Sequence, residues 1–210
     1  MPVLNLTDTP LTEVRATWKA VEDFALGSVL LVAALPLIVL IAIGIKLSSR
    51  GPVIYAQERV TWNGRRFEMY KFRTMPVDAE ARSGPVWSSR AESRATPFGA
   101  LLRRFSLDEL PQLFNVLRGE MSVIGPRPHA VAHDNHYVDL IDDYLGRHRV
   151  KPGITGWAQV HGFRGETRSV DDMRRRIELD LEYIDNWSLW TDLRILARTV
   201  LVGFVHRNAH

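Results

Sequence analysis

The sequence predicts an α/β (α+β) fold, in which a compact, mostly helical domain rests on a membrane-embedded, Pro-broken helix. The first observation is an apolar run over residues 24–45 that contains no charged side chain. Apolar and polar residues alternate on both sides of Asn63-Gly64, which indicates a β-hairpin. Two helical stretches, residues 170–185 and 188–205, close the chain, and the second repeats apolar residues at helical spacing.

The composition fits one folded domain attached to a membrane. The 210 residues are 46% hydrophobic and 24% charged, as in ordinary globular domains. The chain contains no cysteine, which excludes disulfides, thiolate zinc sites and cysteine nucleophiles. A net charge of +3 suits an anionic membrane, a nucleic acid or a phosphorylated substrate, and the apolar run favours the membrane. We therefore divide the chain into a membrane segment, residues 1–50, and a main domain, residues 51–210.

The apolar run is long enough to cross a hydrocarbon core of about 30 Å. Pro36 lies near its middle and removes one backbone hydrogen bond, which predicts a kink. Basic residues flank both ends: Arg15 and Lys19 before the run, and Lys46, Arg50 and Arg59 after it. Basic flanks mark the cytoplasmic side, so a re-entrant helix that enters and leaves on that face satisfies both. A simple span with a periplasmic N-terminus remains the alternative.

The remaining elements follow from periodicity and from turn residues. Residues 11–23 read as a short amphipathic helix that leads into the membrane. The further predictions, in chain order, are strands over 53–60 and 66–75, a loop over 76–97, a helix over 107–118, a strand over 121–125, a rigid loop over 125–128, a helix over 131–148 and a turn-rich loop over 151–156.

The last predicted helix, residues 188–205, allows two interpretations. Its apolar residues repeat at helical spacing, and Trp187 and Trp190 stand at its start. Tryptophan is favoured in the headgroup layer of a membrane, so the helix could lie on the lipid surface. Ordinary packing against the core explains the same pattern equally well.

The segment Ser106-Leu107-Asp108-Glu109 also allows two interpretations. S-x-x-E is a capping box, in which serine and glutamate complete the first turn of a helix. Arginines precede the segment, and a carboxylate beside arginines at a helix N-terminus has its charged form favoured. An ionised aspartate is what a nucleophile attacking phosphorus requires. A cap and a catalytic pair are compatible.

Several cations are mounted on predicted rigid elements. Lys71 and Arg73 are two apart on a strand and should point to the same face. Arg127 lies between two prolines, and Arg164 lies in a glycine-punctuated loop. Each alone is typical of a solvated surface charge, but together they would suit a diphosphate.

Other familiar sites are disfavoured. The sequence contains neither G-x-x-x-x-G-K-[ST] nor G-x-G-x-x-G, so a nucleotide would not be held by those loops. His129, His133 and His136 fall at helical spacing, but we expect surface residues there rather than a metal site.

Five segments in one order resemble a known family. They are KFRTM (71–75), SLDELPQL (106–113), GPRP (125–128), KPGITGWAQV (151–160) and GFRGET (162–167). Together they are similar to the bacterial sugar transferases, which are monotopic polyprenyl-phosphate hexose-1-phosphate transferases, or phosphoglycosyl transferases. The similarity runs from about Lys19 to Val205, and the closing segment resembles the branch that initiates exopolysaccharide synthesis.

The resemblance implies a re-entrant membrane helix and a reaction in two steps. Asp108 would attack the β-phosphate of a UDP-sugar and release UMP, and undecaprenyl phosphate would then attack the phospho-sugar enzyme. Glu109 is implied as the Mg²⁺ ligand and as an acid/base partner. Five positions match phosphate- and substrate-binding residues of the family: Lys71, Arg73, Arg103, Arg127 and Arg164.

The resemblance also implies a location and a set of partners. It places the protein in the bacterial inner membrane, with the catalytic domain on the cytoplasmic face and membrane lipids around its helix. It implies no nucleic-acid partner and allows a homo-oligomer. Glucose and galactose suit this branch, while N-acetylated and trideoxy sugars stay open. Larger relatives carry additional N-terminal membrane helices and a further domain, so we expect this chain to be the short form.

Two positions depart from the family pattern. Many relatives have Lys-Arg where this chain has Lys19-Ala20, and Ser-Pro where it has Leu35-Pro36. Both changes concern hydrogen bonding at the helix break rather than the chemistry. The rival function is a non-catalytic, membrane-tethered module whose arginines bind anionic lipid or nucleic acid. That function explains the charge and the anchor but gives the carboxylate pair no role.

Overall fold

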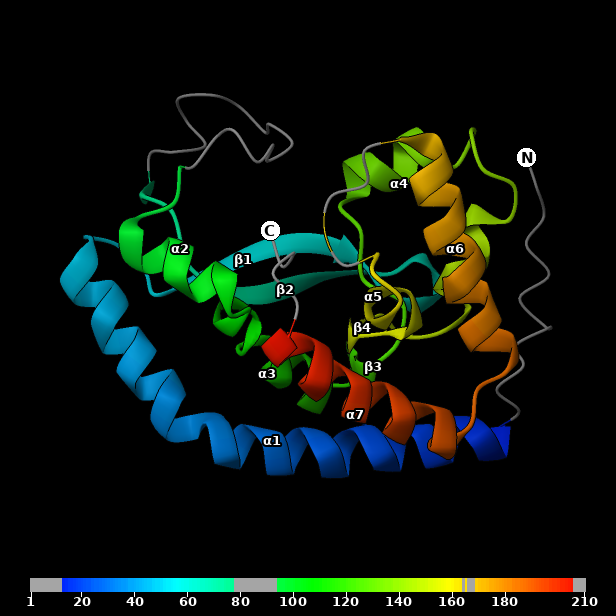
Figure 1. Cartoon of the computed structure of the whole chain (residues 1–210), viewed down its shortest axis with the longest axis horizontal. Coiled ribbons are helices and arrows are strands. Elements are labelled where there is room, and N and C mark those ends of the chain that lie inside the picture. The colour runs from blue at the N-terminus through cyan, green and yellow to red at the C-terminus, as the bar shows by residue number, and fades with distance from the viewer. Residues whose placement is uncertain (1–12, 78–93, 164, 166–168, 206–210) are drawn as a thin grey trace.

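A computed structural model describes residues 13–77, 94–163, 165 and 169–205. It confirms a mixed domain of helices and short strands that carries a long apolar helix at the N-terminal side (Figure 1). The described residues form two β-sheets of two strands each, and the helices surround them.

The first helix, α1 (Glu13–Ser48), is longer than predicted. The expected amphipathic helix and the apolar run are joined in one continuous helix of 36 residues. The reason is local, because residues 13–23 contain neither proline nor glycine to end a helix. Pro36 lies inside α1, and Figure 1 shows the helix running beneath the domain and then bending upward. A proline is the usual cause of such a bend.

The predicted hairpin is confirmed. Strands β1 (Ile54–Val60) and β2 (Arg66–Phe72) pair antiparallel. A short turn, η1 (Trp62–Gly64), joins them. Asn63 and Gly64 have φ values of 58° and 69° there, the left-handed conformation that these two residue types adopt most readily.

A helix that the sequence analysis missed follows the segment 78–93, which lies outside the described residues. This helix, α2 (Pro97–Arg104), starts at Thr96, whose side chain accepts a hydrogen bond from Gly99 N. Pro97 occupies its first position, where a missing N–H costs nothing. The last two residues of the predicted loop over 76–97, Thr96 and Pro97, therefore start this helix.

The predicted helix over 107–118 is divided in two. The structure has a 3-10 turn, η3 (Leu107–Glu109), followed by α3 (Gln112–Leu117). Pro111 lies between them and cannot donate to the carbonyl four residues earlier, so the α-helical ladder starts again after it.

The second half of the domain contains a small parallel sheet. Strand β3 (Ser122–Ile124) was predicted, but its partner β4 (Gly153–Thr155) lies in the segment predicted as a loop. The predicted helix over 131–148 is divided into two elements: α4 (Val131–Tyr137) and η4 (Tyr144–Arg149). Three helices close the described chain: α5 (Trp157–Val160), α6 (Val170–Asp185) and α7 (Leu189–Val205). The last two match the prediction.

Both halves of α1 pack against this domain. Leu26 and Leu30 contact the main core, to which β2, α3, β3, α6 and α7 contribute. Farther along, Ile41 and Ile45 pack with residues of β2 and α2. Polar contacts add to the first attachment, since Lys19 Nζ lies 2.6 Å from Asp192 Oδ2 of α7.

Helix α7 confirms the core-packing interpretation on one of its faces. Ile195 is completely buried in the main core, so the helix packs as a core element. On its opposite face, Trp190 is 75% exposed and Leu201 is 65% exposed. Core packing thus explains one face, and the other face remains an apolar surface.

Asn115 of α3 connects that helix to the hairpin. Its side chain accepts from Tyr70 N at 3.0 Å and donates to Glu68 O at 2.7 Å, and it is completely buried. Asn115→Ala would leave two partly buried backbone groups of β2 without these partners, which costs about 2–4 kcal/mol. We expect a clearly lower midpoint in thermal unfolding of the purified protein. Asn186→Ala, at an exposed amide that bonds Glu182 O, should leave the midpoint within experimental error. Equal midpoints for both variants would contradict this role of Asn115.

Candidate active site

Asp108 and Glu109 lie in the turn η3, between α2 and α3. Asp108 is 9% exposed, and the Glu109 side chain is 12% exposed. Ser106 has a left-handed φ of 54°, whereas a capping serine is extended. The capping-box interpretation is therefore wrong in geometry, and the Glu109 carboxylate turns toward two cations instead.

Glu109 is held by Lys71 and Arg127. Lys71 Nζ lies 2.9 Å from Glu109 Oε1. Arg127 places Nη2 at 2.5 Å from Oε1 and Nη1 at 3.2 Å from Oε2. This two-pronged contact between guanidinium and carboxylate fixes both distance and orientation.

Separate segments bring these two cations together. Lys71 belongs to β2, where it pairs with Tyr55 of β1. Arg127 belongs to the loop after β3. There Gly125 N donates to Thr155 O, and Gly153 N donates to Pro126 O, both at 2.8 Å. The Gly-Pro-Arg-Pro loop thus rests on β4.

Gly153 must be a glycine for this arrangement. A Cβ atom at that position would lie 2.1 Å from Gly125 N, closer than any side chain allows. The close approach explains why two of the sequence motifs, residues 125–128 and 151–160, work as one unit that carries Arg127.

Arg103 lies near Asp108. It occupies the last turn of α2, and its Nε donates to Thr74 Oγ1 at 2.9 Å. Burial lowers the pKa of Arg103, and the negative charge of Asp108 opposes that change. Of the predicted site residues, the structure therefore gathers Lys71, Arg103 and Arg127 around the two carboxylates.

The two carboxylates have pKa values displaced in opposite directions. Burial raises the pKa of Asp108, the charge of Glu109 raises it further, and the surrounding cations only partly oppose this. Burial also pushes the pKa of Glu109 upward, but Arg127 and Lys71 outweigh it and hold that pKa well below its usual range. The arginines therefore do not lower the pKa of Asp108 as expected, because the cations contact Glu109 and Asp108 lies beside the negative charge of Glu109.

Arg73 lies outside this cluster. Its Nη1 donates to Arg50 O at 2.7 Å and its Nη2 to Ser49 O at 3.0 Å, and both residues directly follow the C-terminal end of α1. The prediction that Lys71 and Arg73 share a face is wrong because β2 ends at Phe72, so strand alternation no longer applies. Arg73 ties the membrane helix to the hairpin.

The other predicted residues are placed as follows. Arg164 lies outside the described residues. His129, predicted at the surface, is buried against Tyr144 and Arg147. His136 is exposed as expected. Within the part of the chain that the structure describes, no group of three acidic or histidine side chains could hold a metal.

Sequence reasoning missed Arg59 as a neighbour of this site. Burial and the charge of Arg127 together lower its pKa to about 10, while Glu109 acts in the opposite direction. The signal was present, because Tyr55, Gln57 and Arg59 alternate along β1, and Tyr55 pairs with Lys71. Strand alternation therefore puts Arg59 on the face that carries Lys71.

The carboxylates fit a cation that is shared with a substrate. The Glu109 carboxylate accepts three hydrogen bonds, from Lys71 and Arg127, and a carboxylate offers about four lone-pair sites. One position is thus left on Glu109, and Asp108 adds a second carboxylate. Mg²⁺ commonly takes one or two protein carboxylates together with substrate phosphates and water.

Comparison with known proteins identifies a family and several relatives of this chain. Residues 14–206 match the Bacterial sugar transferase family. The chain is 48% identical over 210 residues to the UDP-glucose:undecaprenyl-phosphate glucose-1-phosphate transferase of Escherichia coli (strain K12), covering 100% of this chain and 45% of that protein. It is 51% identical over 203 residues to the protein so named from Xanthomonas campestris pv. campestris, covering 96% and 42%.

A third relative is named for another sugar. The chain is 44% identical over 173 residues to the UDP-N-acetylgalactosamine-undecaprenyl-phosphate N-acetylgalactosaminephosphotransferase of Aeromonas hydrophila, covering 80% of this chain and 40% of that protein. The chain spans less than half the length of each of these three relatives. The family match includes the carboxylate turn and every described cation around it. The chain belongs to the bacterial sugar transferase family.

Proposed function

We propose that this protein transfers a sugar-1-phosphate from a UDP-sugar to undecaprenyl phosphate and releases UMP. The main observation that supports this function is the buried Asp108, which lies beside a glutamate that two cations hold in place. A rigid set of positive groups around carboxylates suits a diphosphate that changes its charge distribution during reaction. Such a reaction is the first membrane step in making exopolysaccharide or another glycoconjugate.

The proposed chemistry has two displacements at one phosphorus atom. An Asp108 carboxylate oxygen attacks the β-phosphorus, the bond to the bridging oxygen breaks, and UMP leaves with the electron pair. A phosphate oxygen of undecaprenyl phosphate then attacks the same phosphorus, and the Asp108 carboxylate is released. Covalent catalysis divides one difficult step into two easier ones in this way.

Glu109 is the proposed ligand for Mg²⁺, with Lys71 and Arg127 fixing the direction of its carboxylate. When bound, the metal would neutralise charge on the diphosphate. Arg103 is the proposed cation for the phosphates next to Asp108, and Arg164 retains its predicted role as a substrate ligand.

For the sugar, we propose glucose ahead of galactose. Two relatives at 48% and 51% identity carry glucose in their names, and the relative named for N-acetylgalactosamine is at 44%. The test is UMP release by detergent-solubilised protein, with undecaprenyl phosphate and each UDP-sugar in turn. We expect UMP release with UDP-glucose. Absence of UMP release with every UDP-sugar would favour the non-catalytic, membrane-tethered module.

We also propose that α1 is re-entrant, with residues 1–50 at the membrane and residues 51–210 in the cytoplasm. As a straight helix, residues 24–45 would be about 33 Å long and would put their two ends on opposite faces. In the structure, Lys19 binds Asp192 and Ile45 packs beside Phe72, so both ends of the run contact one domain. A bend at Pro36 would allow this within one leaflet.

Cysteine labelling tests the topology in this cysteine-free chain. Val14, at the start of α1, is 67% exposed. In spheroplasts, a membrane-impermeant maleimide should miss Val14→Cys in the parent and reach it after Pro36→Leu, which restores the backbone hydrogen bond. Arg174→Cys in α6 is the cytoplasmic control and should be labelled only in everted vesicles. Strong labelling of Val14→Cys in spheroplasts of the parent would mean that the helix spans.

A further inference from the structure

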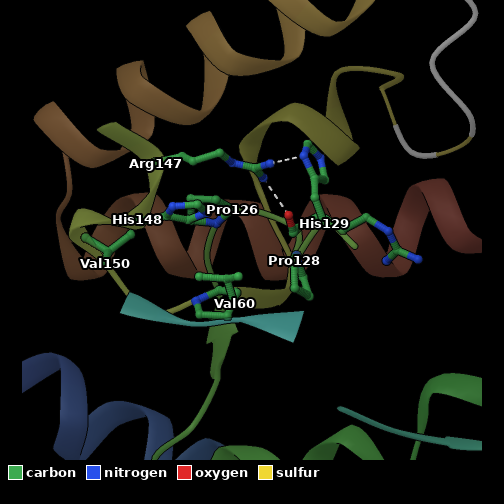
Figure 2. A pocket seen from close by; sticks show the side chains of 9 residues that line it. Val60, Pro126, Pro128, His129, Arg147, His148 and Val150 are labelled. Atoms are coloured by element: carbon green, nitrogen blue, oxygen red, sulfur yellow. Dashed lines mark hydrogen bonds between the residues drawn. The ribbon is translucent and has the colours of Figure 1, made fainter. Parts of the chain in front are cut away.

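A buried group of polar side chains adjoins the loop that carries Arg127. Arg147 of η4 is at its centre and is 3% exposed. Its guanidinium donates to the backbone carbonyl of Arg127 and contacts Nδ1 of His129, as the dashed lines of Figure 2 show. Asp180 of α6 binds the same guanidinium at 3.0 Å, and both side chains of this pair are 2% exposed.

The loop depends on its carbonyl groups for attachment. Pro126 and Pro128 have no N–H to donate, so two of the three residues 126–128 cannot be held through their nitrogen atoms. Pro126 O accepts from Gly153 N at 2.8 Å, and Arg127 O accepts from Arg147. Arg147 therefore anchors the peptide from which the Arg127 side chain extends to Glu109.

We propose that Arg147 is a positioning residue for the transfer reaction: it fixes the backbone of Arg127 and, through it, the two-pronged contact with Glu109. The inference rests on the proposed function and deepens it. Lys71 approaches Glu109 from β2, so loss of Arg147 should weaken one of the two cation contacts and spare the other. The Glu109 carboxylate would then keep its charge partner but lose its fixed orientation.

The test variant must remove the anchor without leaving a lone buried charge. Replacing one member of a buried ion pair is strongly destabilising, whereas replacing both by apolar side chains is often tolerated. We therefore choose Arg147→Met/Asp180→Leu. The matched control is Arg149→Met/Asp185→Leu, because that pair also joins η4 to α6, at 3.0 Å on the surface.

The expected result is a non-additive cycle with Arg127→Lys. In the parent background, Arg147→Met/Asp180→Leu should lower kcat/KM about ten- to hundredfold, because small misplacements of catalytic groups have effects of that size. In the Arg127→Lys background, the same pair of substitutions should lower it less than about threefold, since the contact it supports is already lost. The control pair should change neither value by more than about twofold.

A second readout does not require activity. In the parent background, Arg127→Lys should lower the thermal unfolding midpoint. In the Arg147→Met/Asp180→Leu background, Arg127→Lys should lower the midpoint by less than half as much, because the two-pronged contact is already weakened there. Should the double variant fail to fold, Arg147→Lys replaces it, since one ammonium group cannot serve both Asp180 and the Arg127 carbonyl. Equal losses in both backgrounds, in kcat/KM or in midpoint, would overturn the proposal. Failure of the parent to release UMP would refute the proposed function instead, and the midpoint cycle would still decide the role of Arg147.

Discussion

Asp108→Asn is expected to lower UMP release at least about a thousandfold while the protein stays fully folded, because removing a catalytic nucleophile has effects of this size or larger. The amide has nearly the shape of the carboxylate but cannot form the bond to phosphorus. The rate should be measured with UDP-glucose, both with and without undecaprenyl phosphate. Asp171→Asn, at a surface carboxylate that pairs with Arg174 and whose side chain is 86% exposed, is the matched control and should keep the parental rate.

The stability of the Asp108→Asn variant follows from the raised pKa. Folding raises the pKa of Asp108, chiefly by burial, so the folded protein holds a proton there more tightly than the unfolded chain. The ionised carboxylate therefore lowers the free energy of unfolding at pH values above both pKa values. A neutral asparagine removes that penalty, and the unfolding midpoint at pH 7.5 should be equal to or higher than the parental one. A rate within about tenfold of the parent would remove Asp108 from the nucleophile role.

Glu109→Gln is expected to lose both activity and stability. Activity should fall at least about a hundredfold, because glutamine offers Mg²⁺ a neutral ligand and gives Arg127 one acceptor atom in place of two. The free energy of unfolding should fall by about 2 kcal/mol, since Lys71 and Arg127 lose their shared counter-charge. The value is moderate because these side chains are 19% and 26% exposed, so water can compensate in part.

The pH dependence gives this expectation a definite sign. Folding lowers the pKa of Glu109, so its stabilising contribution is present above the unfolded value of 4.5 and is lost as the pH falls through the folded value. The parent should therefore lose more stability than Glu109→Gln on acidification below pH 4.5. Excess EDTA should abolish the activity of the parent, and the variant should need more Mg²⁺ for its remaining rate. Glu178→Gln, at a surface pair with Arg175, is the control. Parallel stability curves for parent and Glu109→Gln would contradict the assigned ion pairs.

Local patterns predict much of this fold. The Asn63-Gly64 turn specifies the hairpin because these two residue types accept left-handed backbone. The amphipathic repeat specifies α6, and its start at Ser169 follows the usual capping rule, with the side chain accepting from Asp172 N. The apolar run also predicts a long helix correctly, and the helix is long and apolar enough to cross a membrane.

Non-local contacts explain where the sequence-based predictions fail. Strands β3 and β4 are only three residues each, so neither carries a strong periodic signal, and they pair across the intervening elements α4 and η4. Arg73 does not share a face with Lys71 because β2 ends at Phe72, one residue before Arg73. The ends of strands are the least predictable feature of a sequence. The sequence around Arg147 does not indicate that this side chain is buried. Its burial depends on Asp180 of α6, which is distant along the chain. The carboxylate turn is recognisable from sequence, but the opposite pKa changes of Asp108 and Glu109 depend on which of them the cations reach.

The central claim is a covalent phospho-sugar on Asp108, and the most direct measurement is the mass of the intact protein. The purified protein would be mixed with UDP-glucose and Mg²⁺, without lipid acceptor, and quenched in acid within one turnover. We expect a mass increase of one phosphohexose on the parent, together with up to one equivalent of UMP, and loss of the adduct when undecaprenyl phosphate is added. The Asp108→Asn variant should show neither the adduct nor UMP. An unmodified parent that releases UMP only when undecaprenyl phosphate is present would contradict the claim and indicate direct transfer between the two substrates.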